Sequence, residues 1–428
     1  MTDLIKLKSL VASDGYETEL EKIYVTKHEV SRQRTRLEKL INNFSVLFGE
    51  NREAELFSAP GRTEIGGNHT DHNNGKVLAA SINLDAVAVV SKNDENIVRV
   101  KSEGYPMDTV NLDELDKITD DHLKSAALVR GVCAGFKLRG YKIGGFDAVT
   151  ASDVLKGSGL SSSAAFEVLL GTILNHVYNE GKISPVIIAQ IAQYSENEYF
   201  GKPCGLMDQT ASSVGGFVTI DFKNPKLPVI EKVDFDFASC GYALCIVDTG
   251  GSHSGLNEEY AAIREEMESV AKAIGGNTLR DVPQTEFEAG IPALRIEVGD
   301  RAVLRAIHFY ADNNRVLKQV NLLRNGDFEG FKAEVIESGR SSYMYNQNIY
   351  LCNNPMCQPV SIALCLSEKM LTGKGAWRVH GGGFAGTIQA FVPLDELENY
   401  KACMESVFGF NSCHVLSIRP VGGMKICG

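Results

Sequence analysis

The stretch "FDAVTASDVLKGSGLSSSAAFEVLLGTIL" at residues 146–174 decides the fold, because it passes from a strand pattern through a Gly/Ser loop into a helix pattern. Apolar residues over 146–154 predict a strand, and from Ser161 onward they recur at helical spacing. Gly157 and Gly159 let the backbone approach a ligand closely. Free N–H groups at the start of a helix favour an anion there. The stretch therefore predicts a phosphate-binding loop.

This loop fits neither of the two commonest phosphate-binding motifs. A Walker A loop requires GK[ST], which is absent, and the dinucleotide motif GxGxxG fails because Ser162 stands at its last glycine. The alternative is that the serines only cap a helix and the glycines make a turn. A cap rarely needs three consecutive serines beside G-x-G, so we expect the backbone and hydroxyls of the loop to bind phosphate. The predicted binding residues are Gly157, Ser158, Gly159, Leu160, Ser161, Ser162 and Ser163.

A second stretch, "GRTEIGGNHTDHNNG" at residues 61–75, is dense in short polar side chains with little to bury. His69 and His72 lie three residues apart with Asp71 between them, so a metal ion is one candidate ligand. A sugar is the other, since a carboxylate accepts hydrogen bonds from vicinal hydroxyls and a neutral imidazole can bond a third. A Gly-rich loop lacks the helix face of an HExxH zinc site, which favours the sugar.

Composition limits the classes of partner. The chain has 428 residues, 44% hydrophobic and 23% charged, which predicts a globular protein of two domains. Its net charge of -11 argues against nucleic acid or an anionic membrane as partner. Ten cysteines without a CxxC pair, no signal-peptide pattern and no apolar run of membrane-spanning length indicate a cytoplasmic protein with free thiols.

Further along the chain, two stretches could complete a site. "YSENEYFGKPCGLMDQ" at residues 194–209 places Glu196 on a helix and Asp208 after a turn. Phosphoryl transfer needs a hydroxyl and a carboxylate on Mg²⁺ and a base near the attacking hydroxyl, roles that Ser163, Glu196 and Asp208 could fill. "RVHGGGFAGT" at 378–387 adds a second glycine cluster. These patterns together indicate an enzyme that uses a nucleotide.

Taken in order, these motifs resemble those of the GHMP small-molecule kinases, and within them the galactokinases. "SAPGRTEIGGNHTDHNNG" resembles the galactokinase sugar signature, "KGSGLSSSAA" the GHMP phosphate loop and "HGGGFAGT" the closing glycine motif. "PCGLMDQ" and "SHSGLNEEY" also fit, and the resemblance runs from about residue 48 to the end.

The resemblance implies an α+β fold of two domains: a ribosomal-protein-S5-like α/β domain at residues 48–220 and a ferredoxin-like domain at 221–428, with the active site in the cleft between them. Residues 1–47 form a helical N-terminal extension by their own periodicity. The implied reaction is transfer of phosphoryl from ATP, with Mg²⁺, to the anomeric C1 hydroxyl of galactose. Asp208 would be the base with Arg62 beside it, and Ser163 and Glu196 would hold Mg²⁺. The implied sugar-binding residues are Asn68, His69, Asp71, Gly205 and Tyr260.

The signature also departs from the usual pattern N-[LIV]-I-G-[DE]-H-x-D-Y. Glu64 stands at the usual Asn, Asn68 at the usual acid and His72 at the usual Tyr. An amide accepts more weakly than a carboxylate, so the identity of the sugar stays open. Galactose is expected, and N-acetylgalactosamine or L-arabinose are alternatives. A non-catalytic galactose/ATP sensor is the rival from another class. Oligomeric state is open, and a monomer is compatible with the sequence.

Overall fold

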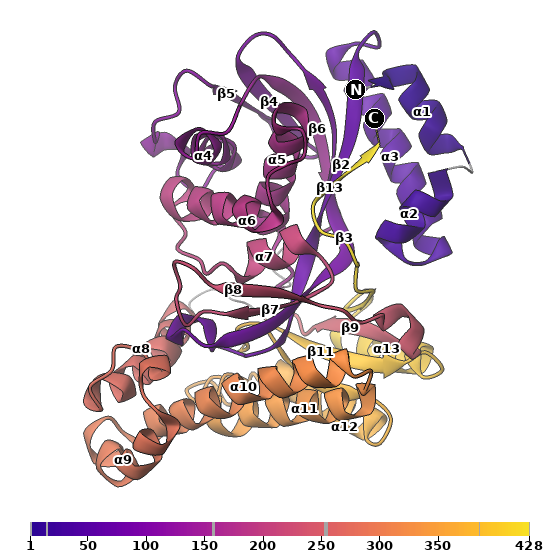
Figure 1. Cartoon of the computed structure of the whole chain (residues 1–428). Helices are drawn as coiled ribbons and strands as arrows, with labels where there is room; N and C mark the ends of the chain where they lie inside the picture. The colour runs from indigo at the N-terminus through magenta and orange to yellow at the C-terminus, as the bar shows by residue number, and fades with distance from the viewer. Residues whose placement is uncertain (1, 14–15, 156–158, 252–255, 385, 428) are drawn as a thin grey trace.

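The computed structural model describes residues 2–13, 16–155, 159–251, 256–384 and 386–427. Within these residues the chain forms two β-sheets with helices packed against each (Figure 1). This confirms the expected α+β class. No helix among the described residues is long and apolar enough to cross a membrane.

The first sheet has the strand order β1-β2-β3-β6-β4-β5, with β13 paired to β2, β7 to β3 and β8 to β7. Among the described residues of this sheet, β4 and β6 run parallel and the other strand pairs are antiparallel. The strands are β1 (Thr2–Asp3), β2 (Glu53–Gly66), β3 (Lys76–Lys92), β4 (Ile97–Ser102), β5 (Met107–Asn111), β6 (Phe146–Ser152), β7 (Phe217–Asp221), β8 (Val229–Val233) and β13 (Met424–Cys427).

Both faces of this sheet are buried, because successive side chains of its long strands alternate between two cores. Leu56 and Val87 pack against the N-terminal helices α1 (Leu4–Ala12), α2 (Glu17–Tyr24) and α3 (Lys27–Phe48). Phe57 and Ala88 face the opposite core with the helices α4 to α6. In Figure 1 these two groups of helices lie to the right and left of the sheet. The second group is α4 (Ser125–Leu138), α5 (Ser162–Asn179), α6 (Pro185–Tyr194) and α7 (Met207–Val214), with the π-helix η4 (Ser195–Phe200) after α6.

The second sheet is antiparallel, with the order β10-β11-β9-β12. Its strands are β9 (Tyr242–Asp248), β10 (Ala376–His380), β11 (Thr387–Pro393) and β12 (Cys413–Leu416). One face packs on α10 and α11 and the other on α12 and α13. The helices here are α8 (Asn257–Ala273), α9 (Gln284–Glu297), α10 (Asp300–Arg324), α11 (Phe328–Ser341), α12 (Pro359–Leu371) and α13 (Leu397–Phe408). Short helical turns are η2 (Asp71–Asn73), η3 (Thr119–Asp121), η5 (Phe237–Cys240), η6 (Leu279–Asp281) and η7 (Ser342–Asn346).

The chain crosses between the two sheets more often than a division at residue 220 implies. β8 and β13 both lie beyond residue 220 and join the first sheet. A bridge between Ile82 and Ile418 adds a further link to the same strand system. The domain boundary at residue 220 therefore stays a prediction. The strand pairing shows that the chain returns to the first sheet at β8 and at β13.

Candidate active site

Arg62 and Asp208 form a bidentate ion pair although they lie far apart in the sequence. Arg62 lies on β2 and Asp208 in the first turn of α7. The Nε of Arg62 donates to Oδ1 of Asp208 at 2.7 Å, and an Nη donates to Oδ2 at 2.5 Å. The side chain of Asp208 keeps 27% of its exposure, so a ligand can reach the carboxylate. The predicted catalytic pair is thus assembled in one place.

The protonation state of Asp208 follows from this pairing. Burial alone raises the pKa of a carboxyl group, but the charge and hydrogen bonds of Arg62 outweigh burial here, with a further hydrogen bond from Ser161. The pKa of Asp208 therefore lies below its ordinary value. The group is a carboxylate at neutral pH.

The local backbone geometry of β2 places Arg62 beside Asp208 and the phosphate loop. The register of β2 on β3 shifts between Pro60 and Arg62, as it does at a bulge. Gly61 lets β2 approach the phosphate loop, since a Cβ there would lie 2.9 Å from the carbonyl oxygen of Leu160. The N–H of Arg62 donates to that same carbonyl at 3.0 Å, and its guanidinium donates to the carbonyl of Gly159. The sugar signature and the phosphate loop are therefore in direct contact.

Asp71 and Gly205 lie next to this pair. Asp71 begins η2, and a Cβ on Gly205 would stand 3.2 Å from its Oδ2. Burial raises the pKa of Asp71, with Asp208 nearby adding to the effect. Two carboxylates therefore lie near each other in one polar site, and glycine at 205 leaves the space beside Asp71 free.

The two signature histidines are joined in a chain of hydrogen bonds. Nε2 of His69 lies 3.0 Å from the carbonyl of Gly382, so it must carry the proton and donate. Nδ1 of His69 is then free to accept from Nε2 of His72 at 3.4 Å. Burial and the neighbouring His69 lower the pKa of His72 to about 3, so its ring is neutral. No cluster of three or more His, Cys, Asp or Glu that could hold a metal occurs among the described residues.

Asn68 is completely buried and its side-chain amide has a protein partner for every hydrogen bond it can make. Nδ2 donates to Oε1 of Glu64 at 3.0 Å and to the carbonyl of Gly381 at 2.7 Å. Oδ1 accepts from Asn348 at 2.9 Å and from Ser342 at 3.2 Å. An amide has two donors and two acceptor positions, so none is left for a ligand in this arrangement.

Glu64 is held from the other side by Arg378 on β10. An Nη of this fully buried arginine donates to Oε1 of Glu64 at 2.8 Å. The usual positions of amide and acid are thus exchanged, and the acid at 64 neutralises a buried cation. Tyr260 on α8 completes this side, with its hydroxyl donating to the carbonyl of Gly383 at 3.2 Å and its ring against Phe384.

Ser163 and Glu196 meet as the sequence predicted. The Ser163 hydroxyl donates to Oε1 of Glu196 at 3.1 Å, and Gln209 donates to the other carboxylate oxygen at 2.8 Å. Behind them lies Glu167, which the sequence reasoning missed. Burial, with Glu196 nearby, raises the pKa of Glu167 well above its ordinary value. Its position four residues after Ser163, on the apolar face of the helix, was the available signal.

The described part of the phosphate loop begins at Gly159, because the predicted residues Gly157 and Ser158 lie outside the described residues. Ser161 adopts φ 58° as the N-cap of α5, and its side chain makes no capping hydrogen bond. The helix-cap alternative therefore does not explain this serine. Ser162 and Ser163 form the first turn of α5.

His380 is a second residue that sequence reasoning missed. It is buried beneath the phosphate loop, where a Cβ on Gly159 would lie 3.3 Å from its ring. Its ring nitrogens lie 3.0 Å from the hydroxyls of Thr63 and Thr387. A histidine directly before a run of three glycines was the available signal.

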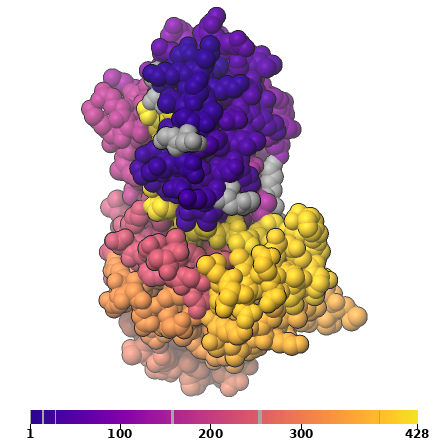
Figure 2. All heavy atoms as spheres, turned by 90° about the vertical axis from the view of Figure 1, so that its right-hand side faces the viewer, coloured from indigo at the N-terminus to yellow at the C-terminus, as the bar shows by residue number. Residues whose placement is uncertain are grey.

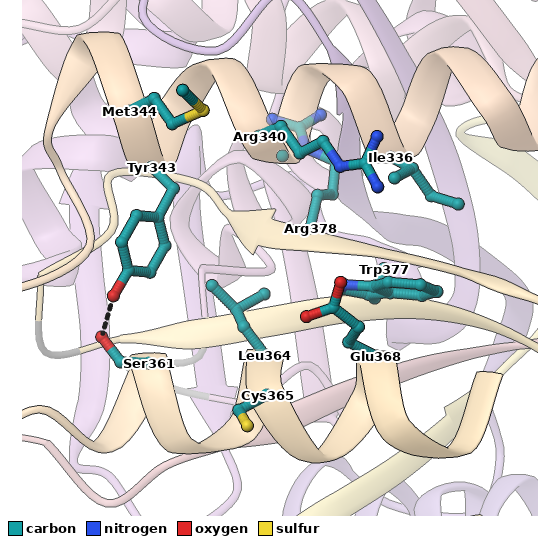
Figure 3. A pocket seen from close by; sticks show the side chains of 11 residues that line it. Ile336, Arg340, Tyr343, Met344, Ser361, Leu364, Cys365, Glu368, Trp377 and Arg378 are labelled. Carbon is teal, nitrogen blue, oxygen red and sulfur yellow. Dashed lines mark hydrogen bonds between the residues drawn. The ribbon is translucent and has the colours of Figure 1, made fainter. Parts of the chain in front are cut away.

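A separate pocket of about 320 Å³ opens between α11 and α12 beside β10 (Figure 3). Trp377, Tyr343, Leu364 and Glu368 are among its lining residues. It shares Arg378 with the contacts of Glu64 and contains none of the predicted site residues. The pocket is therefore distinct from the assembled site.

Comparison with known families agrees with this geometry. Residues 42–92 match the model of the galactokinase galactose-binding signature. Residues 126–216 match the model of the GHMP kinases N terminal domain. The two matches contain Arg62, Asp71, Ser163 and Asp208, which the fold brings together.

Similar proteins extend the likeness to most of the chain. A galactokinase of Streptomyces coelicolor is 31% identical over 388 residues, covering 89% of this chain and 96% of that protein. A galactokinase of Actinobacillus pleuropneumoniae serotype 3 is 31% identical, with coverage of 84% and 90%. The crystal structure of Lactococcus lactis galactokinase complexed with galactose superposes with a TM-score of 0.74 at 25% identity, covering 90% of this chain and 98% of that one. On this likeness, and with the ion pair and serine loop in place, the chain belongs to the galactokinase family of GHMP small-molecule kinases.

Proposed function

We propose that this protein transfers the γ-phosphoryl group of ATP to the anomeric C1 hydroxyl of galactose and releases galactose 1-phosphate. The observation that carries the proposal is the Arg62–Asp208 pair, which touches the phosphate loop at Gly159 and lies beside Asp71 and Gly205 of the sugar-binding stretches. The attacking hydroxyl has to lie between the sugar and the phosphates of ATP. The carboxylate of Asp208 lies at this junction, because it is next to both the sugar signature and the phosphate loop. A cytoplasmic location suits an ATP-dependent reaction and remains part of the proposal.

Asp208 would act mainly by positioning the sugar hydroxyl. Because its pKa is held low, it is a weak base and accepts the proton late, as the bond to phosphorus forms. Arg62 keeps Asp208 ionised and faces the carbonyl of Gly159, so its charge is available to the transferred phosphoryl group.

The sugar hydroxyls would be bound around this pair by His69, Asp71, Gly205 and Tyr260. Asp71 is the strongest acceptor among them, and Gly205 leaves space beside it. Asn68 would have to exchange one of its protein partners to reach the sugar. We therefore assign the direct contacts first to Asp71, Gly205 and Tyr260, because both ring nitrogens of His69 also have protein partners and one of them would have to exchange.

The nucleotide would lie along the start of α5, with the backbone of Gly159 to Ser162 around its phosphates. Ser163 and Glu196 fit Mg²⁺, since a hydroxyl and a carboxylate oxygen converge at 3.1 Å and this ion prefers oxygen ligands shared with phosphate. When bound, Mg²⁺ would neutralise charge on the β- and γ-phosphates. Glu196 is held in place for this by Gln209.

The test is a kinase assay on purified protein with ATP and Mg²⁺, following both ADP release and formation of the sugar phosphate. Galactose, N-acetylgalactosamine and L-arabinose form the panel. Asp208→Asn should lower kcat by roughly 10²- to 10⁴-fold, because the amide cannot accept the proton. Asp300→Asn is the matched control, since Asp300 is an exposed aspartate paired with Arg295 on α9.

Each outcome of the assay points to one reading. Turnover of galactose that depends on Asp208 supports the proposal. Faster turnover of another sugar than of galactose would indicate that Glu64, Asn68 and His72, which depart from the usual signature, select a different substrate. Binding of galactose without turnover of any sugar would contradict the proposed kinase activity and favour a non-catalytic sensor.

A further inference from the structure

We propose that the N-terminal helix α3 is a positioning element of the nucleotide site, because it anchors the start of the phosphate loop through Asp153. The inference rests on the proposed function in so far as the loop binds ATP. Figure 2 shows the N-terminal segment, in indigo, on the surface of the molecule, and Figure 1 shows its helices on one side of the first sheet. Helices α1 to α3 occupy most of the N-terminal segment, and the contacts of α3 indicate what that helix does.

Asp153 lies directly after β6, where the chain enters the phosphate loop. Its Oδ2 accepts from Arg32 at 2.8 Å and from Gln33 at 3.1 Å, and Nη1 of Arg36 lies 3.3 Å away. Three side chains from little more than one turn of α3 thus converge on a single carboxylate. Gln33 is fully buried, so its bond to Asp153 is shielded from water.

Arg36 also holds the backbone on which Asp153 depends. Its guanidinium donates to Oδ1 of Asp85 at 2.6 Å, to the carbonyl of Asp85 at 2.9 Å and to the carbonyl of Ala151 at 3.0 Å. The N–H of Asp153 donates to the same carbonyl of Asp85 at 2.9 Å. One arginine of α3 therefore ties the middle of β3, at Asp85, to the end of β6, at Ala151, before the loop begins.

The other end of the loop is held by the site itself. Arg62 binds the carbonyls of Leu160 and Gly159, and Val154 packs where a side chain on Gly61 would otherwise lie. The loop is thus anchored upstream by α3 and downstream by Arg62. Contacts that already hold Asp153 and Gly159 in place lower the conformational entropy lost at these two residues when ATP binds, so loosening the contacts of Asp153 should weaken ATP binding.

The described hydrogen bonds and ion pairs that Arg32, Gln33 and Arg36 make with the first sheet go to Asp153, Asp85 and Ala151, and not to Asp71 or Gly205. Loss of the contacts of Asp153 should therefore weaken the binding of ATP and leave the binding of the sugar unchanged. This split distinguishes a positioning role from a general loss of stability, which would affect both substrates.

The experiment compares Asp153→Asn and Arg32→Ala with wild type by steady-state kinetics, by direct titration with ATP and Mg²⁺, and by thermal unfolding. Asp153→Asn should raise the KM and Kd for ATP about fivefold, and Arg32→Ala about twofold, with the KM for galactose unchanged. Arg32→Lys keeps the cation and should restore wild-type values. Lys39→Ala is the matched control, because Lys39 lies on the same helix and forms an exposed ion pair with Glu103 at 2.7 Å.

The inference is overturned if Asp153→Asn lowers the Tm without changing ATP binding, or if it raises both KM values equally. Arg32→Ala keeps the test open should Asp153→Asn fold poorly, since Arg32 is 43% exposed. Direct titration separates this inference from the proposed function. If the wild-type protein binds ATP but does not phosphorylate galactose, the proposal that galactose is the substrate is refuted. The comparison of Kd values for ATP would still test whether α3 positions the phosphate loop through Asp153.

Discussion

His380 links the phosphate loop to the second sheet and makes stability depend on pH. Burial, together with Arg62 and Arg378 nearby, lowers its pKa to about 3. The same side chain in the unfolded chain takes up a proton near pH 6.5. Between these values the unfolded state binds more protons, so the free energy of unfolding falls as the pH falls.

We expect His380→Gln to remove this dependence while keeping a polar group for Thr63 and Thr387. From about pH 7.5 to about pH 5, wild type should lose about 2 kcal/mol more of its free energy of unfolding than the variant does. Urea unfolding at the two pH values measures the difference. His122→Gln, at an exposed histidine, should keep the wild-type dependence. Identical slopes for wild type and His380→Gln would contradict the assignment.

At the residue scale, the resemblance predicted pairs that no local pattern could join. Arg62 with Asp208, and Ser163 with Glu196, meet as expected. The surroundings of Asn68 could not be predicted, because its four partners come from three segments of the chain and meet only in the packed structure.

The closing glycine motif offers a prediction at the scale of one element. Gly381 and Gly383 both have positive φ, at 61° and 84°. A Cβ on Gly381 would meet nothing within 4 Å, whereas one on Gly383 would run into the carbonyl of Asn348. We therefore expect Gly381→Ala to cost about 1 kcal/mol of backbone strain, and Gly383→Ala to cost several times more.

Thermal unfolding and activity of the two alanine variants test this difference. Gly383→Ala should also lose activity, because the carbonyl of Gly383 accepts from Tyr260 and the loop must shift to relieve the contact. Equal losses of stability in the two variants would show that φ alone sets the cost.

Element patterns were predicted better than their arrangement. Strands were expected at residues 77–100, and β3 and β4 confirm them, but both pair with β6, which lies between them. The segment 61–66 was read as part of a polar loop and instead ends β2. Pairing with β3 and contacts with the second sheet bury its polar residues, which periodicity alone does not show.

At the scale of the whole molecule, Asp85 joins segments that span the entire chain. The carboxylate is fully buried and accepts from Tyr24 at 2.8 Å, from Arg36 at 2.6 Å and from Arg419 at 3.1 Å. Burial alone would raise its pKa, but the two arginines outweigh burial and hold the pKa below its ordinary value. The N-terminal helices, the first sheet and the C-terminal segment are therefore tied at one charged group.

Arg419→Met should break this tie and leave Asp85 with a single cation. Removing one partner of a buried ion pair costs about 3–5 kcal/mol, which for a chain of 428 residues corresponds to a Tm lower by roughly 3–5 °C. Because the depressed pKa of Asp85 gives stability that is lost as the pH falls through it, the gap between wild type and variant should narrow in acid. Arg340→Met is the control, since Arg340 is exposed and pairs only with its helix neighbour Glu337 in the described contacts, and its Tm should stay within about 1 °C of wild type. A gap that stayed constant from neutral to acid pH would mean that Arg419 stabilises by packing, and that the charge on Asp85 contributes little.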